Sequence, residues 1–216
     1  GDALLFALAH WAVGKPNAEQ FPWGELPLHV LLIHNWGFTA DLTWNDPSWS
    51  ISGEFAAYLL FPLLALSGDW RRVPSFVVLL VAAAAAIELH LLFEANGAVI
   101  LDGQIPRLGI VRAILEFTIG VLLCILWQRH RGPPAFALAA AGLLLSALLW
   151  GSGAAAEPSV APATLAALLF LLALTADARP NPLASRPIHY LGEISYSTYL
   201  VHFLGFVAFK ILFVDE

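Results

Sequence analysis

The chain has 216 residues, of which 59% are hydrophobic and only 12% are charged, and its formal net charge at pH 7 is −6. Soluble domains carry about 25% charged residues, so this composition cannot cover a water-facing surface and excludes an ordinary soluble enzyme. No Lys/Arg-rich tract is present, which excludes a typical nucleic-acid partner. The composition instead predicts an all-α, polytopic bundle of transmembrane helices whose main partner is the lipid bilayer.

The chain opens with an apolar stretch, "GDALLFALAHWAV" (1–13), which looks like the end of a longer helix. No methionine occurs anywhere, so we expect the sequence to be part of a larger protein and its 216 residues to be one partial membrane domain. The next apolar stretch, 26–36, is too short to span a bilayer and is expected to be re-entrant or interfacial. Six runs of spanning length follow at 47–67, 73–93, 106–127, 134–151, 160–176 and 188–213.

The basic residues predict how these spans cross the membrane. Six of the ten Lys and Arg residues fall in alternate connections, which are "DWRR", "QRHR" and "ARPNPLASR", whereas the intervening connections are poorer in them. Cytoplasmic loops are enriched in Lys and Arg, so these three connections are expected in the cytoplasm. Residues 14–46 are then on the outer side of what we expect to be a bacterial inner membrane.

A polar stretch, "NDPSWSISGEF" (45–55), precedes the first of the six spans. Asp46 is a suitable N-cap and Pro47 suits a first helical position, so we expect the helix to start here. Glu54 then lies about 10 Å along the helix at 1.5 Å per residue. It shares one helical face with Ser50 and Tyr58, which stand at i, i+4 spacing from it.

Glu54 is expected to be buried in the bundle, because an unpaired carboxylate in hydrocarbon costs several kcal/mol. A carboxylate there needs a partner or a watery cavity, and it is more often functional than structural. Two functions fit the residues alone. Glu54 could belong to an enzyme's active site, or it could be the proton or substrate site of a secondary transporter or flippase. A purely structural glutamate, bonded to neighbouring hydroxyls, is the third reading.

Three stretches together resemble the acyltransferase 3 family of integral membrane proteins. "PSWSISGEFAAYLLFPLL" (47–64) is similar to that family's W-S-[LI]-S-x-E-x-x-x-Y-x-x-x-P signature. "VRAILEFTIGVLLCIL" (111–126) looks like its R-x-x-x-x-F-x-x-G helix, and "HYLGEISYSTYLVHF" (189–203) looks like its L-G-x-I-S-Y-S-x-Y-L-x-H-F segment. The departures are small: Val201 stands where a tryptophan is common, and no proline follows Phe203.

The resemblance implies transfer of an acyl group, commonly acetyl, from cytoplasmic acyl-CoA to a hydroxyl of an exported glycan of the cell envelope. Acyl-CoA would be a co-substrate, and no resident cofactor is expected. The family fold is a bundle of about ten helices. Its proposed catalytic histidine and an R-x-x-R pair lie before the matched region, so we expect them, together with one last helix, to be missing from this chain, and the chain alone to be inactive.

The resemblance also suggests roles for the polar residues of the first motif. Glu54 is the expected catalytic residue, either orienting a histidine or acting on the acceptor hydroxyl itself. The expected substrate-binding residues are Ser48, Trp49, Ser50, Ser52, Tyr58, His34 and Asn35. Several have plainer alternatives: Trp49 also suits an interfacial anchor, His34 suits a satisfied structural histidine, and Ser52 as an acyl carrier has no adjacent base in the sequence.

The later motifs carry residues whose roles stay open. Arg112 and Glu116 stand at i, i+4 and are expected to pair structurally, although Arg112 could also lie on the acyl or coenzyme path. Ser195, Tyr199 and His202 share one face of the last span, where they could line the same path or hold helices together. The seven histidines show no HxxxH spacing and there is no CxxC, so no metal site is expected.

Overall fold

All regular structure in the described part of the chain is helical, which confirms the all-α prediction. The computed structural model describes residues 21–70 and 72–213, and the stretch 1–13 therefore lies outside the described residues. Four short elements occur: η1 (Trp23–Glu25), α2 (Leu26–Val30), η2 (Asp46–Ser48) and η3 (Pro182–Ala184). The long helices are α3 (Trp49–Leu66), α4 (Ser75–Ala95), α5 (Ile105–Arg129), α6 (Pro133–Gly151), α7 (Glu157–Thr175) and α8 (Arg186–Phe213).

The six long helices match the six expected spans to within a few residues. Five helical segments are long and apolar enough to cross a membrane: Asp46–Leu66, Ser75–Ala95, Ile105–Arg129, Pro133–Gly151 and Glu157–Thr175. Large apolar side chains are exposed along them, as on Leu63, Leu80 and Leu138. Such surfaces are stable against hydrocarbon and costly in water, so the chain is an integral membrane protein.

Proline and glycine set the helix ends, as the sequence predicts. Proline occupies one of the first two positions of η2, α5, α6 and α7. Its fixed φ suits a helix start, and its missing N–H would be unpaired there anyway. Gly97 and Gly153 follow α4 and α6 with φ of +68° and +69°. Glycine adopts this left-handed conformation without steric cost, which lets the chain leave the helix.

The start of α3 differs from the expectation in one respect. Asp46 caps neither helix: Asn45 is the N-cap of η2, whose turn joins the Ser48 N–H to the Asn45 carbonyl at 2.9 Å, and Ser48 is the N-cap of α3. The α-helix proper begins only at Trp49. It then runs without interruption through Pro62 to Leu66.

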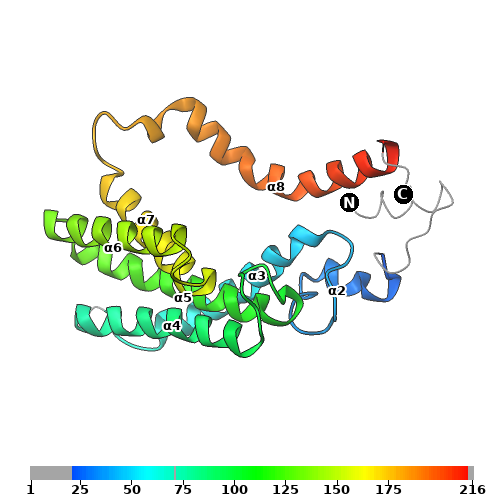
Figure 1. Ribbon diagram of the computed structural model, residues 1–216, viewed down its shortest axis with the longest axis horizontal. Coiled ribbons are helices and arrows are strands. Elements are labelled where there is room, and N and C mark those ends of the chain that lie inside the picture. The colour runs from blue at the N-terminus through cyan, green and yellow to red at the C-terminus, as the bar shows by residue number, and fades with distance from the viewer. Residues whose placement is uncertain (1–20, 71, 214–216) are drawn as a thin grey trace.

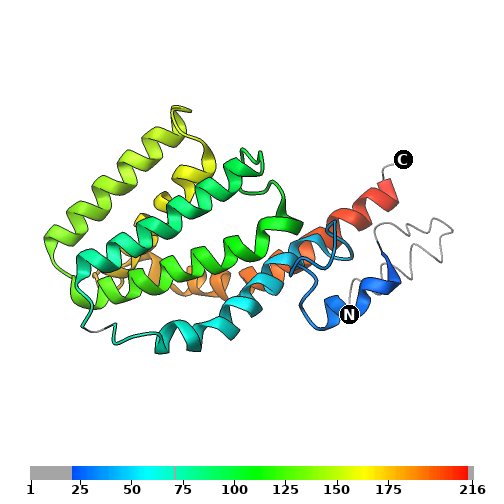
Figure 2. The ribbon, with the colours of Figure 1, turned by 90° about the horizontal axis from the view of Figure 1, so that it is seen from below.

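Helix α5 is the centre of the bundle. It packs against α3, α4 and α7, and α6 packs against α7 on the outside (Figures 1 and 2). One core cluster joins Leu89, Phe93, Leu101, Leu108 and Ala161, and a second joins Val78, Leu122 and Leu126. Within the described residues α8 contacts only η2 and η3, and it runs across the bundle as a separate arm (Figure 1).

Side-chain bonds fasten the two ends of the bundle. At one end, Arg129 donates to the carbonyls of Val73 and Trp70, which ties the α3–α4 connection to the end of α5. At the other end, the Leu101 N–H donates to Glu157 at 3.1 Å, joining the α4–α5 connection to α7. The starts of α4 and α6 and the ends of α5 and α7 all lie at the Arg129 end (Figures 1 and 2). The three basic connections therefore share one end of the bundle, which the predicted orientation requires.

Candidate functional site

Glu54 lies on the face of α3 that is turned away from the bundle core. Four α3 residues are buried, and all of them are small: Ser52, Gly53, Ala56 and Ala57. Glu54 is exposed, so the expected burial of its carboxylate is wrong for the described part of the chain. The reason is its helical position, because Gly53 and Ala57 face α5 while Glu54 points to the side that α5 does not cover. Its Oε1 accepts a hydrogen bond of 2.7 Å from the Tyr58 hydroxyl.

Helix α8 carries a further phenol on the side of Glu54. Tyr196 lies within range of the Glu54 charge, although among the described residues no hydrogen bond or ring contact joins it to Glu54 or Tyr58. Asn45 positions the helix, because its side-chain amide donates to the Leu200 carbonyl at 3.4 Å. Tyr196 was missed by reasoning from the sequence, although it stands inside the third motif. It lies one position from Ser195, on a different face from the expected Ser195–Tyr199–His202 stripe.

The Trp49 ring, at the start of α3 and five residues before Glu54, contacts the side chain of Arg112 on α5. The Arg112 guanidinium lies 5.4 Å from the centre of the Trp49 ring. It also pairs with Glu116 at 3.1 Å, which confirms the structural pairing, and donates to the Leu101 carbonyl at 2.9 Å. A cation over an indole face stabilises both groups. Arg112 therefore holds the Trp49 ring in place at the N-terminal end of α3.

His34 is buried under the start of α3 and contacts Ser48. The Ser48 hydroxyl lies 3.1 Å from His34 Nε2 and donates to the Asn45 carbonyl at 2.6 Å. Because that hydroxyl proton is used by Asn45, His34 must carry its proton on Nε2 and donate to Ser48. His34 therefore does not act as a base toward Ser48. It joins the loop 31–45 to the start of α3 through Nε2, but its buried Nδ1 has no hydrogen-bond partner among the described residues, so the expected satisfied structural histidine is only half borne out.

His29 stacks on His34 and extends this arrangement to a loop threonine. The two imidazole centres are 4.0 Å apart and nearly parallel. Thr43 donates to Glu25 at 2.8 Å and lies 3.0 Å from His29 Nε2, so His29 also donates from Nε2. Burial, together with the charge of His34, lowers the pKa of His29 from 6.5 to about 4. Burial likewise lowers the pKa of His34. Both rings are neutral at pH 7, and no spacing in the sequence indicated that these two rings would stack.

Ser52 and Asn35 form a second connection between the loop and α3, inside the fold. Ser52 is fully buried, and its hydroxyl accepts the Asn35 backbone N–H at 3.1 Å. The Ser52 carbonyl also accepts the Trp36 indole N–H at 3.0 Å. A group in this position reaches no substrate unless the loop moves. No histidine among the described residues pairs with Glu54, so the orienting role expected for that carboxylate stays a prediction.

The polar face of α8 is present as expected. Ser195 donates to the Gly192 carbonyl in its own helix, and the rings of Tyr199 and His202 lie 5.6 Å apart. All three side chains are exposed. Their part in an acyl or coenzyme path stays a prediction. Among the described residues, no group of three His, Cys, Asp or Glu side chains lies close enough to hold a metal ion.

Comparison with known proteins gives one family. A family model described as an acyltransferase domain matches residues 3–216. The chain is also similar to an acyltransferase named MdmB from Streptomyces mycarofaciens, at 30% identity over 208 residues. That alignment covers 84% of this chain and 51% of the relative, so the chain spans about half the length of the curated protein it matches. No solved structure matches the chain.

Proposed function

The chain belongs to the acyltransferase 3 family, and from that premise we propose that the whole protein is a membrane acyltransferase in which Glu54 takes part in the reaction. The donor is an acyl-CoA, most simply acetyl-CoA, and the acceptor is a hydroxyl of an extracytoplasmic glycan. The observation that carries the proposal is the hydrogen bond of 2.7 Å from the Tyr58 hydroxyl to the Glu54 carboxylate. It places a carboxylate and a phenol together at the exposed side of an otherwise apolar helix.

The proposed reaction moves the acyl group from sulfur to oxygen. The acceptor hydroxyl oxygen bonds to the thioester carbonyl carbon while the C–S bond breaks. The hydroxyl proton passes to a base and a proton reaches the departing thiolate, so the products are an ester and free CoA. Glu54 is the proposed base or the group that orients one, because an acceptor hydroxyl needs its proton removed as it attacks. Tyr58 holds the carboxylate in place through its hydrogen bond of 2.7 Å.

Trp49 is the proposed platform for the acceptor. Its ring is fixed by Arg112 at the outer end of α3, about one and a half turns before Glu54. Sugar rings pack on aromatic faces through their apolar C–H surfaces. Ser50 lies on the same side of the helix as Glu54 and suits contact with acceptor hydroxyls. The start of α3 that carries Trp49 is held to the preceding loop by two hydrogen bonds. One joins Ser48 to His34, and the other joins Ser52 to Asn35.

The test uses the whole protein in membrane vesicles, with radiolabelled acetyl-CoA and an envelope glycan fraction as acceptor. Glu54→Gln is expected to lower label transfer by at least about 100-fold, the usual contribution of general acid–base catalysis. Glu88→Gln is the matched control, because Glu88 is also an exposed carboxylate on a membrane-length helix but lies on α4. Both variants must reach the membrane in equal amounts.

Wild-type transfer by Glu54→Gln would contradict the proposed role of that residue. The alternative function, a transporter or flippase with Glu54 as its proton or substrate site, predicts a different result. A transporter would move substrate across the vesicle without forming an ester, and no label would enter the glycan from any variant.

A further inference from the structure

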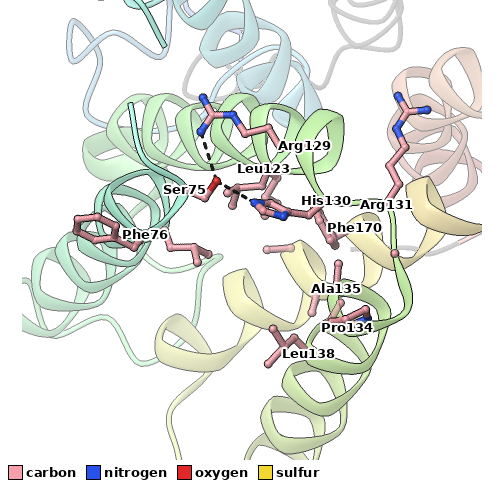
Figure 3. Close-up of a pocket in the computed structure, with 16 residues that line it drawn as sticks. Ser75, Phe76, Leu123, Arg129, His130, Arg131, Pro134, Ala135, Leu138 and Phe170 are labelled. Carbon is pink, nitrogen blue, oxygen red and sulfur yellow. Dashed lines mark hydrogen bonds between the residues drawn. The ribbon is translucent and has the colours of Figure 1, made fainter. Parts of the chain in front are cut away.

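A large cavity lies at the basic end of the bundle, far from Glu54. Its volume is about 690 Å³, and its walls come from α4, α5, α6 and α7 (Figure 3). It exists because α4 and α6 do not touch within the described residues, although each packs on α7. Ligand cavities in proteins span about 300–1,000 Å³, so this one is large enough for a small molecule or a lipid chain.

The cavity is polar at one end only. Its polar lining residues are Ser75, Arg129, His130 and Arg131, and the others are apolar or glycine. The imidazole of His130 and the side chain of Arg129 both bond to the Ser75 hydroxyl, as the dashed lines in Figure 3 mark. The apolar walls include Phe76 and Leu138, which are 65% and 76% exposed. This arrangement suits an amphiphile with a compact head and a long apolar tail.

The polar end is positively charged. Within residues 21–70 and 72–213, neither Arg129 nor Arg131 pairs with a carboxylate: Arg129 donates to backbone carbonyls, and Arg131 stacks on Trp127 at 4.0 Å. No carboxylate in the described part of the chain therefore neutralises their charges. Helices α4 and α6 begin at this end, whereas α5 and α7 end there, so their dipoles offset one another and the two arginine side chains supply the positive charge. An anionic head group complements this end.

We propose that this cavity binds an anionic glycerophospholipid of the cytoplasmic leaflet. The phosphodiester lies beside His130 and Ser75, in the positive field of Arg129 and Arg131, and one acyl chain lies against Phe76, Leu138 and Phe170. Basic recesses between transmembrane helices on the cytoplasmic side take such head groups. The space is bounded by the apolar flanks of two helices that do not meet, so a chain can enter sideways from the bilayer. A coenzyme-A head group, with its nucleotide and several phosphates, needs more polar contacts than these four side chains provide.

The test measures which lipid the purified whole protein retains. The protein is delipidated in detergent, mixed with equal amounts of phosphatidylglycerol and phosphatidylcholine, and examined by native mass spectrometry. Wild type is expected to retain phosphatidylglycerol over phosphatidylcholine by roughly fivefold or more, because each basic group near an anionic lipid contributes about that factor. His130→Gln combined with Arg131→Gln is expected to remove most of this preference.

Two further variants separate the head-group and chain contributions. Leu138→Trp fills the apolar wall at an exposed position, so it should reduce retention of both lipids without disturbing the core. Arg72→Gln is the control, because Arg72 pairs with Asp69 in the same basic region but outside the cavity. Equal retention of the two lipids by wild type, or unchanged retention in the double variant, would overturn the proposal. So would displacement of phosphatidylglycerol by equimolar palmitoyl-CoA, which would assign the cavity to the acyl donor. None of these readings depends on acyl transfer.

Discussion

At the scale of single residues, neighbouring serines of the first motif have opposite surroundings. Ser50 is half-buried, and among the described residues its hydroxyl bonds only to the Pro47 carbonyl, one turn earlier. Ser52 is fully buried and accepts a backbone N–H from a distant loop. Replacing them therefore has different consequences, although both serines belong to the same S-x-S pattern.

Ser52→Ala is expected to destabilise the protein by about 1–3 kcal/mol. The alanine leaves the Asn35 N–H buried without a partner, and an unsatisfied buried donor costs that much. Ser50→Ala is expected to change stability by less than about 0.5 kcal/mol, as is usual where no such group is left. Thermal unfolding in detergent compares the two variants. A Ser52→Ala protein as stable as wild type but unable to transfer acyl groups would instead favour Ser52 as an acyl carrier.

The stacked histidines make stability depend on pH. The pKa of His29 is lowered in the folded state from 6.5 to about 4, so between these values the unfolded chain binds more protons. The contribution of His29 to stability is thus complete above pH 6.5 and is lost as the pH falls toward about 4. The lowered pKa of His34 acts in the same direction.

His29→Gln tests this dependence, because glutamine keeps an N–H donor for Thr43 but does not titrate. As the pH is lowered from 6.5 to about 4, we expect the melting temperature of wild type to fall more than that of His29→Gln. Equal slopes would show that other groups, such as carboxylates, account for the acid sensitivity.

At the scale of helices, α3 and α5 are held together by a close contact at small residues. A Cβ added at Gly53 would lie 2.8 Å from Ala113 Cβ, closer than carbon atoms can pack. One added at Gly109 would lie 2.5 Å from the Asn35 side-chain nitrogen. Small residues allow helix backbones to approach closely in membranes, where lipid gives no hydrophobic force between helices.

Gly53→Ala is expected to destabilise the bundle by about 1–3 kcal/mol. The new methyl group would clash with the Ala113 Cβ, and this atom can move away only if the α5 backbone shifts. Gly120→Ala is the matched control in α5, since nothing lies within 4 Å of its added Cβ. That change is expected to be neutral or to stabilise by up to about 1 kcal/mol, because alanine favours a helix over glycine. Unfolding measured in the same detergent distinguishes them, and equal effects would contradict the close packing of α3 on α5.

The helices could be predicted from the sequence, but the loop between α2 and α3 could not. A long apolar run ended by proline or glycine indicates a membrane helix and its limits without any tertiary contact, and so α3 to α8 agree with the expected spans. The contacts of His29, His34, Asn35 and Ser52 depend on the path of a loop with no periodic pattern. Burial of Glu54 was predicted from the cost of a charge in hydrocarbon, yet the residue sits on the uncovered side of α3. The pairing of Arg112 with Glu116 was predictable because it follows from helical spacing alone.

At the scale of the whole molecule, the bundle has two chemically distinct ends. The basic connections lie together around Arg129, and the loop 31–45 lies at the other end, beside Glu54. This arrangement agrees with the orientation predicted from the Lys and Arg distribution. Acyl transfer across a membrane requires such a division, because the donor and acceptor are proposed to approach from opposite sides.

Cysteine labelling tests the orientation directly. In a cysteine-free background of the whole protein, Ser152→Cys and Ser185→Cys each place one thiol at an exposed position, in the α6–α7 and α7–α8 connections respectively. We expect an impermeant maleimide to label Ser152→Cys in intact cells and Ser185→Cys only after permeabilisation. The reverse pattern would invert the proposed sides and place Glu54 near the cytoplasm.

The hydrogen bond from Asn45 to Leu200 has a mechanical consequence. Apart from its contacts with η2 and η3, α8 touches no other helix in the described residues, and Leu200 lies near its middle. Asn45 therefore links the loop 31–45 to the middle of the arm. Tyr196 is one helical turn from Leu200, so a displacement of this loop is expected to move the phenol relative to Glu54.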